Sequence, residues 1–228
     1  MSNVAIHQPE YFPWLNFFFK MKNCNKFIFL DSVQYSKRSF QNRNILGKDG
    51  NSFYITVPIV RASRDTLISD IKIDNTKKWI DEHTKKFHYC YNKAKFFKPV
   101  ITLIENEYNK CYQYLNELNQ GLIKSLAKKM EIECDFFSST ELNVTGKKSK
   151  LILDLCEKTK TIKYITGFGS KSYLDEEKFK ERKIEVCYLR LNNFFYFQEN
   201  SKKKFIKDLS IVDYLFNLGF DEFKKIKI

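Results

Sequence analysis

The chain is poor in glycine and proline and has no paired-cysteine motif. Its 228 residues include only 7 Gly and 4 Pro, while 43% are hydrophobic, which argues against disordered and fibrous classes. The six cysteines are scattered without a Cys-x-x-Cys pair, which disfavours a zinc site or a disulfide framework and fits a reducing compartment. We therefore expect a globular protein without a metal site.

The sequence also lacks the features of a targeting segment. Residues 1–7 show no basic region followed by an apolar stretch. No apolar run reaches the length that spans a bilayer. These absences predict a cytoplasmic protein with no membrane span.

Arginine is scarce, although the net charge is +13. Of the 40 basic residues only six are arginine, and four of them lie between residues 38 and 64. The planar guanidinium binds phosphate or carboxylate with two donors at once, so an anionic ligand is expected near this segment. Most of the lysines are expected to be solvated surface residues, and no nucleic-acid motif accompanies them.

Two clusters of polar and aromatic residues stand out, at residues 7–14 and 34–44. A short hydrophobic run at 27–30 separates them and is predicted to be a buried strand. Residues 3–7 predict a strand, 15–22 a helix, 52–58 a strand and 147–158 a helix. Residues 163–166 predict another strand, and so do residues 184–191, while 209–218 form a terminal helix. The alternation predicts an α/β fold with a mostly parallel, Rossmann-like sheet.

The pattern between about residues 76 and 132 differs from the rest. Apolar residues recur there at helical spacing. We predict three helices at 77–92, 96–109 and 111–131, which form a helical insertion or a cap on the sheet.

His7 and Asp31 are the candidate catalytic residues. Each follows a predicted strand, and open α/β sheets bind ligands beyond the carboxyl ends of their strands. His7 can accept a proton near neutral pH, and Asp31 can orient it; the alternatives are a histidine bonded in its turn and a capping carboxylate. Tyr11 and Trp14 offer rings for stacking on a base or sugar, or they pack in the core.

The second cluster is the densest array of hydrogen-bond donors in the chain. It is predicted to hold a diphosphate and sugar hydroxyls, with the cations on the phosphates; the alternative is an exposed polar loop. Together with Gln8, the candidate binding residues are Gln34, Tyr35, Lys37, Arg38, Gln41, Asn42, Arg43 and Asn44.

A glycine-containing turn follows the strand predicted at 163–166. Gly167, Gly169 and Ser170 can present backbone N–H groups to an anion, and Tyr173 follows closely enough to contact the same ligand. The turn lacks the remaining features of a full phosphate-binding fingerprint. A tight strand-to-helix turn is the alternative reason for the glycines.

Four stretches of the sequence resemble the WbqC-like family. The resemblance implies a single α/β domain over residues 1–228, with the helical subdomain at about 76–132, and a role in bacterial O-antigen or other surface-polysaccharide biosynthesis. It also implies transfer of an acyl or aminoacyl group, such as glycyl, to the amine of a nucleotide-linked amino-deoxysugar. The stretches are 5–14, 30–44, 167–175 and 209–219.

The sequence does not specify the acyl donor, the sugar or the oligomeric state. An acyl-CoA, another acyl carrier, an aminoacyl-tRNA or an ATP-derived adenylate are the candidate donors. Residues 10–16 also resemble the opening of nucleotidylyltransferases and ATP-using ligases, without their His-x-Gly-His motif. The alternatives to a transferase are thus an ATP-dependent ligase or nucleotidylyltransferase, and an RNA- or tRNA-binding module.

Overall fold

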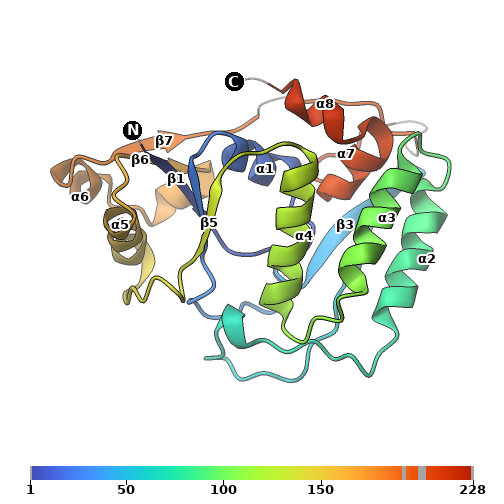
Figure 1. Ribbon diagram of the computed structural model, residues 1–228, viewed down its shortest axis with the longest axis horizontal. Coiled ribbons are helices and arrows are strands. Elements are labelled where there is room, and N and C mark those ends of the chain that lie inside the picture. The colour runs from blue at the N-terminus through green and yellow to red at the C-terminus, as the bar shows by residue number, and fades with distance from the viewer. Residues whose placement is uncertain (1, 192–193, 200–203, 227–228) are drawn as a thin grey trace.

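A five-stranded parallel sheet forms the centre of the protein, in a computed structural model that describes residues 2–191, 194–199 and 204–226 (Figure 1). The predicted α/β class is confirmed. In spatial order the strands are β5 (Asp135–Ser138), β2 (Lys26–Phe29), β1 (Asn3–His7), β6 (Lys163–Thr166) and β7 (Glu185–Tyr188).

The central strands are short apolar runs that are buried on both faces. Val4, Ala5 and Ile6 of β1 are at most 5% exposed, and Phe27–Phe29 of β2 are fully buried. Such continuous apolar strands are typical of parallel sheets that are covered by helices on both sides. The register pairs His7 with Phe29 and Ala5 with Ile165.

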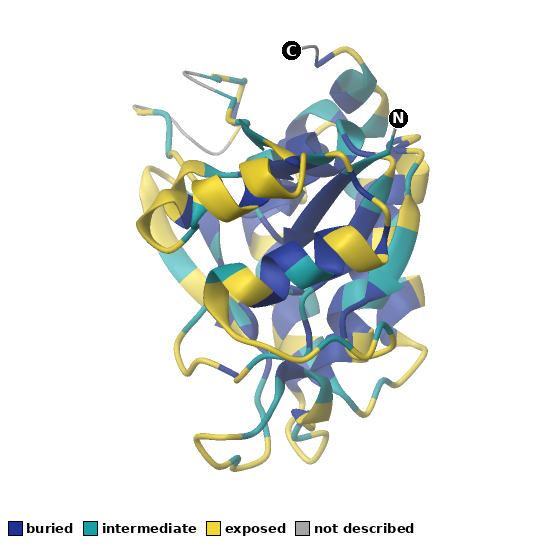
Figure 2. Ribbon diagram, turned by 90° about the vertical axis from the view of Figure 1, so that its left-hand side faces the viewer, coloured by how far each residue is buried: buried dark blue, intermediate teal, exposed yellow. Residues whose placement is uncertain are grey.

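Helices cover both faces of the sheet, and each face has its own hydrophobic core. Helix α1 (Leu15–Lys22) packs with the side chains of Ala5, Phe27 and Phe29. Helices α5 (Lys148–Lys158) and α6 (Glu176–Glu181) cover the opposite face, against Val4, Ile6 and Ile28. Figure 2 shows the exposed outer sides of the helices in front of the buried strands.

The strand order creates a switch point between β1 and β6. From β1 the chain passes outward through α1 to β2 and later to β5, and then returns across the sheet to β6 and β7. The two connections therefore leave β1 and β6 in opposite directions. Ligands of open α/β sheets bind at such a point, outside the carboxyl ends of the strands.

The segment between β2 and β5 contains a hairpin and the predicted helices. Strands β3 (Arg43–Lys48) and β4 (Asn51–Thr56) pair in antiparallel fashion, and the short helix η1 (Ile68–Asp70) follows. The predicted helices are present as α2 (Trp79–Tyr91), α3 (Phe97–Tyr108) and α4 (Leu115–Lys129). They share the core of α1 and of the C-terminal helix α7 (Ile211–Leu218).

Three elements differ from the predictions. Strands β3 and β5 and the last helix α8 (Phe220–Lys224) were not predicted. The Asp49-Gly50 turn of the hairpin has both residues at positive φ, which is the turn that Asp-Gly favours between two strands. The described residues include no helix that is long and apolar enough to cross a membrane.

Candidate functional site

A pocket of about 360 Å³ lies at the switch point of the sheet. His7 ends β1, Thr166 ends β6, and Leu189 and Arg190 follow β7, so several strand ends meet there. We call it the switch-point pocket. Its lining is Ile6, His7, Trp14, Asn16, Lys20, Tyr164, Thr166, Gly167, Phe168, Gly169, Ser170, Tyr173, Leu189 and Arg190.

A second hollow of about 470 Å³ adjoins the first. His7, Trp14 and Arg190 line both hollows. The second hollow, which we call the loop pocket, is lined in addition by Glu10, Phe40, Asn44 and Asp208. Together the two pockets form one site around His7.

The His7 imidazole is neutral and has a defined tautomer. Its Nδ1 lies 3.0 Å from the carbonyl oxygen of Gln8. Because a carbonyl only accepts, Nδ1 carries the proton and Nε2 keeps its lone pair. Burial, together with the charge of Lys20, lowers the pKa of His7 to about 3. His7 is therefore a hydrogen-bond acceptor at neutral pH and a weak base.

Glu10 and Lys20 titrate close to neutral pH. Burial raises the pKa of Glu10 to about 7, and the nearby Lys20 opposes this shift. Burial also lowers the pKa of Lys20 to about 8, against the attraction of Glu10. An acid and a base with such values in a pocket are typical of active sites. Glu10 Oε1 lies 3.9 Å from His7 Nδ1.

Sequence reasoning missed Glu10, Lys20 and Arg190. Lys20 is only 6% exposed, in a helix whose neighbouring side chains are buried phenylalanines and methionine. Its ammonium forms no hydrogen bond or ion pair within the described part of the chain, and it lines the switch-point pocket. Lys20, which stands between Phe19 and Met21 in the mostly apolar run 15–22, was the signal available in the sequence, since buried lysines are rare without a partner.

The turn after β6 opens directly onto the switch-point pocket. Thr166 Oγ1 donates to Ser170 Oγ at 3.1 Å, and Ser170 Oγ donates to the carbonyl oxygen of Gly167 at 2.9 Å. Neither Gly167 nor Gly169 adopts a positive φ, and a Cβ at either position would meet no atom within 4 Å. Neither the turn nor the packing therefore requires glycine, and the backbone here is open to a ligand.

The amides of residues 34–44 serve mainly as internal connections. Gln41 is 1% exposed; its Nε2 donates to Gln8 Oε1 at 2.8 Å, and its Oε1 accepts from the Ser36 N–H. Asn44 Nδ2 donates to the carbonyl oxygens of Tyr11 and Phe12. Asn42 Nδ2 donates to the Val57 carbonyl oxygen at 3.0 Å. The bonds of Gln41 Nε2 and Asn44 hold the loop 8–14 against the start of the hairpin, and the Asn42 bond joins the two residues that flank the hairpin.

The cations of this segment lie outside both pockets. The Arg43 guanidinium lies 4.2 Å from the centre of the Tyr54 ring and donates to the Arg38 carbonyl oxygen. Lys37 and Arg38 are exposed and are not among the residues that line the two pockets.

The remaining predicted residues of this segment also have partners elsewhere. Gln34 donates to Asp65 Oδ1 at 2.9 Å, and Tyr35 is 8% exposed within the core. Of the predicted array, only Asn44 reaches the site around His7.

Tyr11 lies in the core and not in the pockets. It is fully buried, and its hydroxyl lies 2.7 Å from His83 Nδ1 and also contacts the Tyr108 hydroxyl. His83 Nε2 lies 3.2 Å from the Thr56 carbonyl oxygen, so Nε2 donates and Nδ1 accepts from Tyr11. The hydrogen bonds therefore run in one direction, from Tyr108 through Tyr11 and His83 to Thr56.

Asp31 is a buried acceptor and does not contact His7. It is 1% exposed. Its Oδ2 accepts from Asn116 Nδ2 at 3.0 Å and from Ser138 Oγ at 2.6 Å. Its Oδ1 accepts from Ser139 Oγ and from the backbone N–H and hydroxyl of Thr140. These bonds join the end of β2 to the end of β5 and to α4, and the expected pairing with His7 is not formed.

Comparison with known proteins identifies the family of this chain. The family model described as the WbqC-like protein family matches residues 8–225. The chain belongs to the WbqC-like family. It is also 28% identical over 221 residues to the uncharacterized protein Rv1507c of Mycobacterium tuberculosis, covering 96% of this chain and 95% of the relative. No solved structure matches.

The family match covers most of the site in this WbqC-like protein. Glu10, Trp14, Lys20, the turn at 167–170 and Arg190 lie inside the matched residues, and His7 immediately precedes them. The predicted family is thus confirmed.

Proposed function

We propose that this WbqC-like protein transfers an acyl or aminoacyl group to the amine of a nucleotide-linked amino-deoxysugar in bacterial surface-polysaccharide biosynthesis. The observation that carries the proposal is the site at the switch point. An open glycine turn, two cations, an aromatic ring and a carboxyl group with a pKa near 7 meet there. The reaction type itself comes from the family resemblance.

The diphosphate of the substrate is assigned to the turn 167–170 and to Arg190. Backbone N–H groups of a turn and a guanidinium both favour phosphate oxygens. Lys20 adds a second positive charge from the floor of the switch-point pocket. Trp14, which is partly exposed, lines both pockets and offers its ring to the base or the sugar.

Glu10 is assigned as the general base, in place of the His7 expected from the sequence. A base works best when its pKa lies near the working pH. Glu10 meets this condition at about 7, whereas a His7 pKa of about 3 leaves too little driving force for proton transfer. In this scheme the lone pair of His7 Nε2 accepts a hydrogen bond from the sugar amine and aims the nitrogen at the acyl carbon.

Binding of nucleotide-linked sugars to the full chain tests the proposal. Calorimetric titration with UDP- and dTDP-linked amino sugars is expected to show binding, and sugars without the diphosphate are expected to bind far more weakly. Lys20→Met and Arg190→Ala should each weaken binding roughly 10- to 100-fold, because each removes a hydrogen bond to a charged group.

Lys37→Met is the matched control, since Lys37 is exposed outside both pockets. It should leave the affinity unchanged. Unaltered affinity in Lys20→Met and Arg190→Ala would place the ligand elsewhere. Binding of magnesium-ATP without nucleotide sugar would favour the ligase alternative, and tRNA binding that weakens steeply with salt would favour the RNA-binding alternative.

A further inference from the structure

Two aromatic side chains of the switch-point pocket remain half exposed. Phe168 is 49% exposed and Tyr173 is 46% exposed. Both line the switch-point pocket, and neither lines the loop pocket. An exposed ring leaves apolar surface in water, which costs free energy. Two such rings in one pocket are typical of a surface that a ligand covers.

Neighbouring side chains hold the Phe168 ring in place. Its centre lies 5.5 Å from the centre of the Tyr188 ring. The Lys171 ammonium lies 5.1 Å from the Phe168 ring centre and 4.8 Å from the Tyr188 ring centre. The Tyr188 hydroxyl in turn donates to Glu176 Oε1 at 2.5 Å. The ring is therefore positioned before a ligand binds, which lowers the entropy cost of binding.

The chain on either side of Phe168 leaves room for a flat ligand. Gly167 and Gly169 flank it, and a Cβ at either glycine would meet no atom within 4 Å. A planar ring can thus approach Phe168 without meeting a neighbouring side chain. The Tyr173 hydroxyl forms no hydrogen bond with any described residue, so it can bond to a polar edge of the ligand. A ring face together with a free hydroxyl suits a heterocyclic base.

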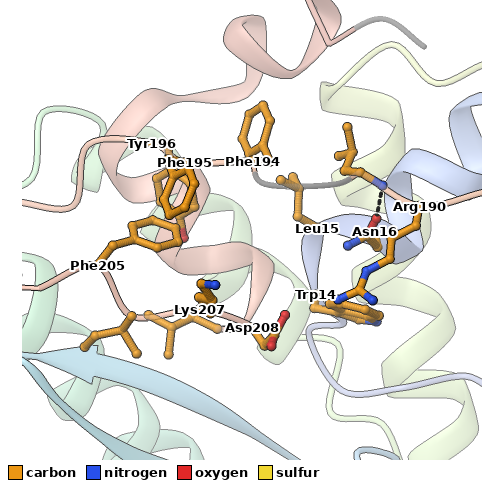
Figure 3. A pocket seen from close by; sticks show the side chains of 13 residues that line it. Trp14, Leu15, Asn16, Arg190, Phe194, Phe195, Tyr196, Phe205, Lys207 and Asp208 are labelled. Atoms are coloured by element: carbon orange, nitrogen blue, oxygen red, sulfur yellow. Dashed lines mark hydrogen bonds between the residues drawn. The ribbon is translucent and has the colours of Figure 1, made fainter.

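A different aromatic ring marks the other end of the site. Trp14 and Arg190 line both pockets, so they stand where the pockets join. The Arg190 side chain extends toward Trp14 at this junction (Figure 3). Glu10 lines the loop pocket, beyond the junction. The site therefore offers one aromatic surface beside the turn 167–170 and a second one toward Glu10.

We propose that Phe168 and Tyr173 bind the nucleobase of the substrate, so that Trp14 faces the sugar and the sugar amine points toward Glu10. This inference rests on the proposed transferase function. The turn 167–170 and Arg190, which are assigned to the diphosphate, lie between the two aromatic surfaces. Base, diphosphate and sugar then follow the site in that order.

This orientation gives the base a role in the reaction although it lies far from the reacting amine. Binding energy from a remote part of a substrate can be used to position the part that reacts. Stacking on Phe168 fixes one end of the nucleotide sugar, and the diphosphate contacts fix its middle. The amine is then held beside Glu10 and His7, which favours attack on the acyl carbon.

Two ligands that differ only in the base test the inference by calorimetric titration of the full chain. Uridine 5′-diphosphate is expected to bind roughly 5- to 150-fold more tightly than ribose 5-diphosphate, since one stacked base contributes about that factor. Phe168→Ala should remove most of this difference and leave the affinity for ribose 5-diphosphate unchanged. Phe168→Trp keeps a ring for stacking and should preserve the difference.

Tyr173→Phe removes only the hydroxyl and should weaken binding of uridine 5′-diphosphate by about 2- to 10-fold, the effect of one lost hydrogen bond. Phe197→Ala is the matched control, because its ring is 68% exposed and lies outside both pockets. It should change neither affinity. NMR gives a structural readout: the uracil ring protons should shift upfield on binding to the natural chain and not on binding to Phe168→Ala.

Equal affinity of the natural chain for the two ligands would overturn the inference. An equal loss of both affinities in Phe168→Ala would also overturn it, since Phe168 would then only shape the turn. In both cases the diphosphate still binds, and the proposed function stands. If neither ligand bound to the natural chain, the diphosphate site of the proposed function would be wrong, and this inference with it.

Discussion

His7 and His83 are both neutral imidazoles with pKa values lowered to about 3, and they lie at the start and against the middle of the loop 8–14. At His83 both ring nitrogens are engaged, with Tyr11 and the Thr56 carbonyl oxygen. At His7 only Nδ1 has a partner among the described residues, and the ring borders two pockets. The two pKa values are alike, so what distinguishes the histidines is that Nε2 of His7 has no partner among the described residues.

The surroundings of the two histidines differ in the same way. Glu10 and Lys20 lie near His7 and titrate near neutral pH. The pKa of His83 is set by burial, by the charge of Lys86 and by a hydrogen bond to the Thr56 backbone. No carboxyl group is among these causes. The region of His7 has features of a reactive site, and the region of His83 those of a structural one.

The largest expected effect is a loss of catalytic rate on substitution in the region of His7, where the region of His83 should contribute none. Glu10→Gln keeps the shape of the side chain but removes the base, so kcat should fall about 10²- to 10⁴-fold. Steady-state kinetics with the acylated product as readout measures this. Glu117→Gln, at an exposed position outside the His7 site, is the matched control. An unchanged kcat in Glu10→Gln would show that this region is no more catalytic than that of His83.

The second effect distinguishes the regions by stability. His83→Leu leaves the buried Tyr11 hydroxyl and the Thr56 carbonyl without their partner, and should lower the free energy of unfolding by about 2–4 kcal/mol. His7→Leu removes one bond at the pocket edge and should cost about 1 kcal/mol or less. Urea denaturation at pH 7.5 measures both. Equal losses would contradict the comparison.

The smallest expected effect is a pH dependence of the free energy of unfolding that His83→Leu loses relative to the natural chain. Between pH 6.5 and 3 the unfolded chain binds a proton that folded His83 does not, so the stability from His83 is present above pH 6.5 and declines below it. His83→Leu lacks this titration. The difference in free energy of unfolding between the natural chain and His83→Leu should therefore shrink by about 1–2 kcal/mol as the pH falls from 7.5 to 5. Urea denaturation at the two pH values measures it.

Asp213 provides a control with the opposite sign. Burial raises its pKa to about 6 from 3.8, so the stability that it adds is present below pH 3.8 and is lost as the pH rises through 6. Asp213→Asn should therefore lose more free energy of unfolding, relative to the natural chain, at pH 5 than at pH 7.5. If both variants changed in the same direction, the assigned protonation states would be wrong.

Strongly apolar segments of the sheet could be predicted from the sequence, and weak ones could not. Strand β1, helix α1 and strand β6 match their predicted bounds because apolar runs define them. Strand β5, Asp135–Ser138, is a short edge strand with polar ends, and its pairing with β2 identifies it. Strand β3 was interpreted as part of a ligand loop, although Asp49-Gly50 offered a hairpin signal.

The polar residues of the site were harder to predict than the fold. His7, Trp14 and the turn at 167–170 do meet in the site, because parallel strands end on one side of the sheet. The amides of Gln41 and Asn44 were expected to bind a sugar, yet they bind the backbone and side chain of a neighbouring loop. The sequence shows that an amide can donate a hydrogen bond, but the acceptor is decided only when the chain folds.

The sequence by itself determined the α/β class, the family and the strand ends at which a ligand would be expected, since these follow from apolar runs and local motifs. Only the tertiary structure decided which polar groups remain available. It buried Tyr11 and Asp31 among partners, and it set Lys20 and Glu10 in one region where lost hydration moves their pKa values toward neutral. Hydration and hydrogen bonding depend on neighbours brought together from distant segments, and no local pattern specifies those neighbours.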